Sequence, residues 1–227
     1  MSTGVVESAG PERGLDEVRQ RIARACERAG RRTEEVRLIG ITKLVPPELV
    51  RRASAAGLGD FGENYAQELA AKRAAAPGAT WHYVGRLQRN KVTAVLDGAD
   101  VVQTLEPGAA ARRLARLAAE RGSAVRCLVE VDFTGHRVGA RPEEVDGFVE
   151  DLAAEPGLRI EGLMTVAPLE GPARRWFARL RELRDGLRRR FGGVRELSMG
   201  MSADYEDAVE EGATMVRVGT ALFGPRR

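Results

Sequence analysis

The feature that most constrains the fold is a repeated alternation between short apolar runs and amphipathic stretches. After residues 1–13, a polar tail without periodicity, strand-like apolar runs recur eight times. They lie at 36–42, 58–61, 81–85, 99–103, 125–132, 158–164, 194–199 and 213–218. Apolar residues at helical spacing occupy 15–29, 47–56, 63–75, 88–97, 108–121, 142–154, 172–190 and 203–211.

This alternation is typical of parallel βαβ units, because each crossover places a helix on the face of the sheet. Eight such units in a chain of 227 residues match the ~200–250 residues usual for a (β/α)8 barrel. An open, doubly wound sheet is the competing architecture, and periodicity does not separate the two. No linker-like segment divides the chain, so we predict one α/β domain, a (β/α)8 TIM-type barrel over residues 14–227.

Composition excludes several classes of protein. Hydrophobic residues make up 43% and charged residues 30%, too apolar for a disordered chain and too charged for a membrane protein. The first ten residues lack the basic and apolar regions of a secretory signal, so we expect a cytoplasmic protein. Cys26 and Cys127 stand in no metal-ligand spacing, and only two histidines are present, which argues against disulfides and a metal site.

The basic character of the chain does not by itself indicate nucleic acid. The net charge is only +3, although the calculated pI is 9.2. The strongest basic cluster, at 174–190, has its apolar residues on one helical face: Trp176, Leu180, Leu183 and Leu187. We therefore expect a solvated barrel helix with its arginines facing water, and RNA binding is the weaker alternative.

Lysines are rare, and one of them stands at a position of chemical interest. Only three of the 36 cationic residues are lysines, and we expect Lys72 and Lys91 on the polar sides of helices. Lys43 ends the apolar strand 36–42, where desolvation favours the neutral amine that attacks an aldehyde. A lysine that simply reaches out to water is the alternative, and we favour the reactive lysine.

Polar and aromatic residues gather where other strands end. The second and third strands run into 60–65 (DFGENY) and 81–88 (WHYVGRLQ), a mixture that suits a flat, ring-shaped ligand. The seventh and eighth run into 197–202 (LSMGMS) and 216–220 (VRVGT). Barrels frequently bind phosphate with these last two loops, because glycines let backbone N–H groups approach an anion.

The hydroxyls of these loops would strengthen a phosphate site. Ser198, Ser202 and Thr220 supply them, although Ser202 could instead only cap the following helix. Acidic residues in the first turn of that helix would repel an anion. We therefore expect the phosphate nearer to Gly219 and Thr220.

One further charge completes the set that a pyridoxal cofactor requires. Arg217 lies on an otherwise apolar strand, where a buried guanidinium needs an acceptor. Such a cofactor needs a lysine for a Schiff base, a phosphate cradle and a partner for the pyridine nitrogen. Lys43, the two glycine-containing loops and Arg217 supply one candidate for each need.

Five motifs occur in order along the chain: ITKLVP, FGENYAQE, WHYVGRLQRNK, GLMTVAP and LSMGMSADYEDAVEEGATMVRVGTALFG. Together they resemble the pyridoxal 5′-phosphate homeostasis proteins, the YggS/PROSC group, over residues 15–224. The resemblance implies an alanine-racemase-like barrel that holds pyridoxal 5′-phosphate as an aldimine on Lys43, with Arg217 facing the pyridine nitrogen. It further implies that the phosphate and the ring are surrounded by Ser198, Met199, Ser202, Gly219, Thr220, Asn64, His82 and Met164.

Two segments depart from the pattern of that group. VVQTLE at 101–106 lacks the Ser/His-Val-Asp expected at the end of the fourth strand. Arg137 stands where a lysine is common in the group. These departures weaken the expectation of a second lysine site for cofactor transfer and leave the Schiff base at Lys43 unaffected.

The resemblance implies a protein that keeps pyridoxal phosphate available, without established catalysis, and the polar helix faces and the lack of a second domain in this sequence lead us to expect a monomer. Related racemases complete their sites with a second domain and a partner chain, and this sequence ends after the eighth strand, so we expect no enzymatic turnover. An arginine beside the pyridine nitrogen also disfavours its protonation and weakens the ring as an electron sink. The alternative is a racemase-like enzyme with Tyr65 or solvent as second acid. Expected partners are the cofactor and apo-enzymes that use it, not membranes or nucleic acid.

Overall fold

Each strand pairs in parallel with the strands before and after it in sequence, and β8 pairs with β1, so the sheet closes into a barrel. This computed structural model describes residues 10–225. The strands are β1 (Arg37–Ile41), β2 (Asp60–Glu63), β3 (Thr80–Tyr83), β4 (Val101–Leu105), β5 (Val125–Glu130), β6 (Leu158–Met164), β7 (Glu196–Ser198) and β8 (Met215–Val218). The predicted (β/α)8 barrel is confirmed, and the open sheet is excluded.

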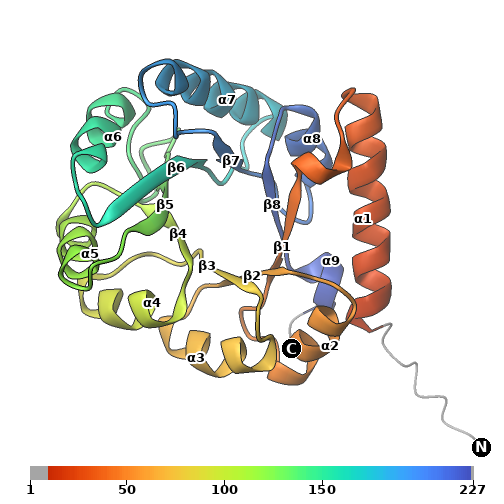
Figure 1. The fold of residues 1–227 in the computed structure, drawn as a ribbon. Coiled ribbons are helices and arrows are strands. Elements are labelled where there is room, and N and C mark those ends of the chain that lie inside the picture. The colour runs from red at the N-terminus through yellow and green to blue at the C-terminus, as the bar shows by residue number, and fades with distance from the viewer. Residues whose placement is uncertain (1–9, 226–227) are drawn as a thin grey trace, which may run out of the picture.

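Helices surround the barrel on its outside (Figure 1). They are α1 (Pro11–Arg28), α2 (Pro47–Ala55), α3 (Ala66–Ala75), α4 (Val92–Gly98), α5 (Ala109–Glu120), α6 (Val145–Ala153), α7 (Ala173–Arg190), α8 (Tyr205–Glu210) and α9 (Thr220–Phe223). Two short 3-10 helices span Thr33–Glu35 and Arg89–Lys91. The short α9 is absent from the sequence prediction, because four residues carry no recognisable period.

Helix α1 precedes the first strand and covers the place where the barrel closes. It packs against α8, α9 and α2, and Figure 1 shows it along the outside of β1 and β8. Its buried face includes Leu15, Val18 and Ile22, as predicted. The helix begins at Pro11, since proline is favoured in the first turn, so residues 11–13 do not belong to the predicted tail. Residues 1–9 of that tail lie outside the described residues.

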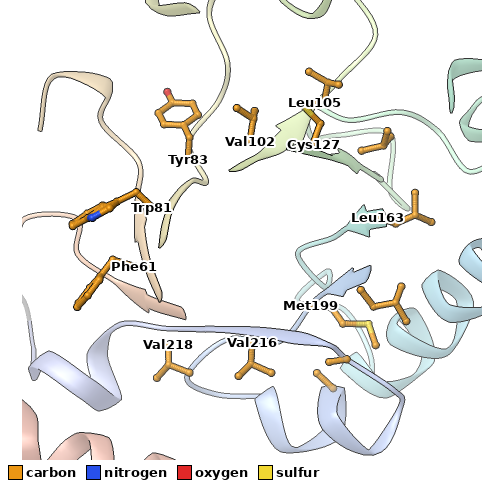
Figure 2. Packing of buried hydrophobic residues seen from close by; sticks show 14 of the residues in the cluster. Phe61, Trp81, Tyr83, Val102, Leu105, Cys127, Leu163, Met199, Val216 and Val218 are labelled. Atoms are coloured by element: carbon orange, nitrogen blue, oxygen red, sulfur yellow. The ribbon is translucent and has the colours of Figure 1, made fainter. Parts of the chain in front are cut away.

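The main hydrophobic core lies between the strands and the helices. Figure 2 shows side chains that point outward from the strands into this layer, among them Trp81, Met199 and Val216. Phe61 and Trp81 stack there with ring centroids 5.2 Å apart. A smaller apolar cluster fills part of the barrel interior around Ile39, Leu128, Met164 and Met215. Buried polar side chains share this interior, among them Gln103, which hydrogen-bonds to His82 and Ser198.

The basic helix α7 is a solvated barrel helix, and four of its eight arginines form ion pairs with other described residues. Arg181 forms an ion pair with Glu211 at 2.6 Å, and Arg190 forms one with Glu150 of α6 at 2.9 Å. The predicted apolar face is wrong at Trp176, which is only half-buried, because Phe177 points into the core instead. None of the described helices is both long and apolar enough to span a membrane.

Candidate functional site

The loops that follow the strands enclose a cavity of about 600 Å³ at one end of the barrel. Its wall is formed by residues at or just after the carboxyl ends of strands β1 to β8. The lining residues are Ile41, Asn64, Val84, Gly85, Arg86, Thr104, Glu130, Arg137, Val138, Met164, Val166, Met201, Ser202, Ala203, Arg217, Gly219 and Thr220. The cavity therefore lies at the end of the barrel where related folds carry their active sites.

Six of the ten predicted site residues line this cavity. They are Asn64 after β2, Met164 at the end of β6, Ser202 after β7, Arg217 on β8, and Gly219 and Thr220 after β8. Side chains separated by up to 156 positions in the sequence thus meet at one site. The other four, Lys43, His82, Ser198 and Met199, do not contribute to the lining.

Arg217 is a buried cation in the cavity wall. Its side chain is buried, with 5% of the residue exposed. Nη1 donates a hydrogen bond to Ser198 Oγ at 2.7 Å, and Nη2 donates one to the backbone oxygen of Thr165 at 2.8 Å. Burial lowers the pKa of Arg217 to about 10, against the opposing influence of the Glu130 and Asp204 carboxyl groups. The guanidinium has five N–H donors, so these two bonds orient it and leave other N–H groups for a further acceptor.

Lys43 stands beside the cavity rather than in its wall. It is half-buried and lies two positions after Ile41, the last residue of β1 and a residue of the cavity wall. The N–H of Val45 donates to Thr42 O at 2.8 Å and closes a tight turn around Lys43 and Leu44. Leu44 has φ of 60°, a left-handed conformation that is strained for leucine. The backbone thus turns sharply at the predicted reactive lysine.

Beneath that turn lies a buried polar cluster that sequence analysis missed. Lys72 donates to Glu63 Oε2 at 2.7 Å, to the backbone oxygen of Thr42 at 2.6 Å, and to Glu68. The Glu63 carboxylate also accepts the Thr42 hydroxyl at 2.8 Å and the backbone N–H groups of Asn64 and Tyr65 at 2.7 and 3.0 Å. The cluster holds the loops after β1 and β2 together.

The predicted exposure of Lys72 is therefore wrong, since only 3% of the residue is exposed. The physical reason is its place on helix α3, where it shares the buried face with Ala66, Leu69 and Ala75. The residues of that face are spaced three positions apart, and this spacing is visible in the sequence. A buried carboxylate beside it, Glu63, makes the position tolerable for an ammonium.

His82 lies too deep in the barrel to reach the cavity. It is fully buried, with Nε2 3.0 Å from Asp60 Oδ1 and Nδ1 2.9 Å from Gln103 Nε2. The inward residue that reaches the cavity from this strand is Val84, two positions further along. Sequence alternation identifies the inward face correctly but does not give the depth at which a residue lies.

Ser198 and Met199 also lie away from the cavity wall. The hydroxyl of Ser198 donates to Gln103 Oε1 at 2.7 Å inside the barrel. Met199 points the opposite way, into the layer between strands and helices (Figure 2). Consecutive strand residues face opposite sides, so only one of these two side chains can point inward. Tyr65, which the racemase-like alternative named beside solvent as a second acid, is 44% exposed and does not line the cavity.

Glu130 is a cavity residue that sequence analysis did not single out. Its carboxyl group makes no hydrogen bond or ion pair with the described residues, although the residue is only 7% exposed. Burial raises the pKa of Glu130 to about 7, while Arg217 and Arg137 act in the opposite direction. Its position within the apolar run LVEV was the available signal, because a lone carboxylate there requires a reason.

Arg137 reaches the cavity from the loop after β5. The carboxylate of Asp132 organises this loop by accepting the backbone N–H of Thr134 and of Arg137, both at 2.8 Å, and the Thr134 hydroxyl at 2.7 Å. These bonds lower the pKa of Asp132 despite its partial burial. Of the three arginines that line the cavity, Arg86, Arg137 and Arg217, the last two act electrostatically on the Glu130 carboxyl group.

Comparison with known proteins agrees with this architecture. The sequence model of the family described as alanine racemase, N-terminal domain, matches residues 14–227. Pyridoxal phosphate homeostasis proteins from Aquifex aeolicus and Pseudomonas aeruginosa are 40% and 39% identical over 221 residues, covering 94% and 93% of this chain and 97% and 94% of theirs. The structure of PipY from Synechococcus elongatus with PLP bound is 34% identical, with a TM-score of 0.82, and covers 94% of this chain and 100% of that one. The resemblance found in the sequence motifs is confirmed: the chain belongs to the alanine racemase N-terminal domain family and, within it, to the pyridoxal phosphate homeostasis proteins.

Proposed function

We propose that this protein binds pyridoxal 5′-phosphate in the cavity at the end of the barrel, with Lys43 as its covalent attachment point. When bound, the cofactor supplies an aldehyde and an electron-withdrawing ring. The Lys43 nitrogen would bond to the aldehyde carbon, and the aldehyde oxygen would leave as water. The names of the relatives and the PLP bound to PipY support this assignment.

Arg217 is the observation that carries the proposal. A buried guanidinium with free N–H donors toward a cavity calls for an acceptor in that cavity. The pyridine nitrogen is such an acceptor, since an arginine beside it acts as donor and leaves the nitrogen unprotonated. At the cavity wall nearby, the hydroxyls of Ser202 and Thr220 can donate to a phosphate group. The residues present therefore fit the cofactor.

We further propose that the protein acts as a cytoplasmic monomer in pyridoxal phosphate homeostasis, supplying cofactor to apo-enzymes without turning over amino acids. An unprotonated ring is a poor electron sink, which disfavours chemistry at the α-carbon of an amino acid. Tyr65 lies outside the cavity lining, so the racemase-like alternative would depend on solvent as its second acid.

Absorbance spectroscopy with peptide mapping tests the attachment. Addition of pyridoxal 5′-phosphate should produce an absorption band that borohydride reduction converts to a stable adduct. Because the chain has only three lysines, mass spectrometry can assign the adduct without ambiguity. Lys43→Ala should abolish the band, whereas the matched Lys91→Ala should retain it. An adduct on Lys72 or Lys91 of the native protein would contradict the assignment.

A racemase-like activity is the second candidate, and Glu130 is the observation that favours it. A carboxyl group with pKa about 7 in the cavity could exchange a proton near neutral pH. Incorporation of solvent deuterium at the α-carbon, measured over a panel of amino acids, separates the candidates. Exchange at enzymatic rates that disappears in Glu130→Gln would establish the enzyme and refute the carrier.

A further inference from the structure

Five polar side chains form one continuous chain of hydrogen bonds through the barrel interior. In order they are Arg217, Ser198, Gln103, His82 and Asp60, from β8, β7, β4, β3 and β2. The successive distances are 2.7, 2.7, 2.9 and 3.0 Å. Arg217 lines the cavity, whereas Asp60 is the first residue of its strand and lies at the opposite end of the barrel. The chain therefore links the cavity to the far end.

Arg217 fixes which partner donates and which accepts at each hydrogen bond of this series. A guanidinium has only donors, so Ser198 Oγ must accept from Arg217 and direct its own proton to Gln103 Oε1. The amide of Gln103 must then present its Nε2 donor to His82 Nδ1. The second hydrogen of that Nε2 faces Met215 Sδ at 3.6 Å. Nδ1 of His82 is thus an acceptor, and its ring proton resides on Nε2, which donates to Asp60.

Two carboxylates lie near the His82 imidazole. Asp60 contacts Nε2 directly, and Asp100, before β4, interacts electrostatically with the same imidazole. Asp100 is itself paired with Arg73 at 2.8 Å and accepts the backbone N–H of Trp81. A second proton on Nδ1 would meet the Gln103 N–H donor. If the Gln103 amide were reversed, its NH2 group would face Ser198. The Ser198 hydroxyl proton would then have no acceptor, because the Gln103 oxygen would face His82 and the Arg217 guanidinium offers only donors.

We propose that Gln103 is a positioning residue: it holds His82 as the neutral Nε2–H tautomer and, through Ser198, holds the Arg217 guanidinium in the orientation it presents to the cavity. The glutamine lies in the segment VVQTLE, which departs from the pattern of the group. The consequence for the cofactor rests on the proposed function, whereas the tautomer of His82 does not.

Nitrogen NMR of the cofactor-free protein tests the direction of the chain. With only two histidines, His136→Gln assigns the spectrum, and the exposed His136 serves as an internal reference. In the native protein His82 should show a protonated Nε2 and an unprotonated Nδ1. A protonated Nδ1 in the native protein would overturn the proposal.

Three variants test the role of the partners. Gln103→Glu replaces the donor by a carboxylate, so His82 should acquire its second proton. Ser198→Ala removes the constraint on the amide, so Nδ1 of His82 should acquire a proton, whereas Ser198→Thr retains a hydroxyl and should keep the native tautomer. Should Gln103→Glu fail to fold, the two Ser198 variants decide the question. A neutral, single-tautomer His82 in Ser198→Ala would refute the role of Arg217 in setting the direction.

The effect on the cofactor is measured separately. Gln103→Met, which breaks the chain with an apolar side chain of similar length, should weaken binding of pyridoxal 5′-phosphate about tenfold and shift the absorption maximum of the bound form. Failure of the native protein to bind would refute the proposed function and leave the NMR result standing. Unchanged affinity and absorption in this variant would refute the positioning role.

Discussion

The ammonium of Lys72 lies 2.7 Å from the carboxylate of Glu63, and the two side chains are 4% and 0% exposed. This buried pair sits directly behind the turn that carries Lys43. Since Lys72 also bonds the backbone of Thr42 and Glu63 bonds the backbone of Asn64, the pair couples two loops of the cavity. Its integrity therefore affects both stability and the shape of the site.

Lys72→Met should destabilise the protein by about 3 kcal/mol, because it leaves the Glu63 carboxylate buried without its counter-ion. Urea unfolding followed by circular dichroism gives the free energy. The half-exposed Lys91 forms no ion pair with the described residues, so Lys91→Met should change the free energy by less than about 0.5 kcal/mol. Similar effects of the two substitutions would show that the pair contributes no special stability.

Glu130 should make stability fall as the pH rises toward neutrality. Its pKa is raised from 4.5 to about 7, so the folded protein holds this proton more tightly than the unfolded chain. The resulting stabilisation is complete below pH 4.5 and is lost as the pH rises through about 7, a change of about 3 kcal/mol. Glu130→Gln does not titrate here, so the variant should gain stability relative to the native protein across this range. A difference independent of pH would contradict the shift.

The turn at Lys43 should become less strained when Leu44 is replaced by asparagine. Asparagine adopts positive φ more readily than leucine, so Leu44→Asn should gain about 1 kcal/mol, and Leu44→Val should lose stability because β-branched residues resist this conformation. Thermal unfolding measures both changes. Leu169, fully exposed and without positive φ, provides the control: Leu169→Asn should leave the midpoint unchanged. Destabilisation by Leu44→Asn would refute the strain.

Gly85 is required where the loop after β2 passes close to the loop after β3. A Cβ at this position would lie 2.1 Å from the backbone oxygen of Asn64, so Gly85→Ala should cost about 2 kcal/mol and weaken binding of pyridoxal 5′-phosphate. Gly147, on the exposed face of α6, has open space where an added methyl group would lie, with no atom of a neighbouring residue within 4 Å. Gly147→Ala should therefore stabilise the helix by about 1 kcal/mol. Calorimetry and cofactor titration of both variants check the contrast.

The order of elements was predictable because apolar runs and helical spacing are local signals, and the predicted strand ends were displaced by only a few residues. The second strand was expected at 58–61 and occurs at Asp60–Glu63. Its start depends on pairing with β1, where Asp60 lies opposite Ile39. Register of this kind is a property of two strands together, and one strand's sequence does not contain it.

The site was predictable where a residue follows the end of a strand, as Asn64, Ser202 and Thr220 do. Prediction failed where depth or burial decided the role. His82 faces inward, as expected, but lies at the level of Gly62 and below the cavity. Glu130 was overlooked because a carboxylate in an apolar run has meaning only once its neighbours, Arg137 and Arg217, are known.

The closure of the barrel has a consequence for biosynthesis. Arg217 is paired in register with Ile39, so strands made at the beginning and near the end of translation lie side by side in the finished protein. A nascent chain emerging from the ribosome presents Lys43 long before Arg217 and Thr220 exist, and contacts so distant in sequence form late in folding. Cofactor capture must therefore follow release of nearly the whole polypeptide, and ribosome-stalled chains that stop before β8 should remain unable to retain it.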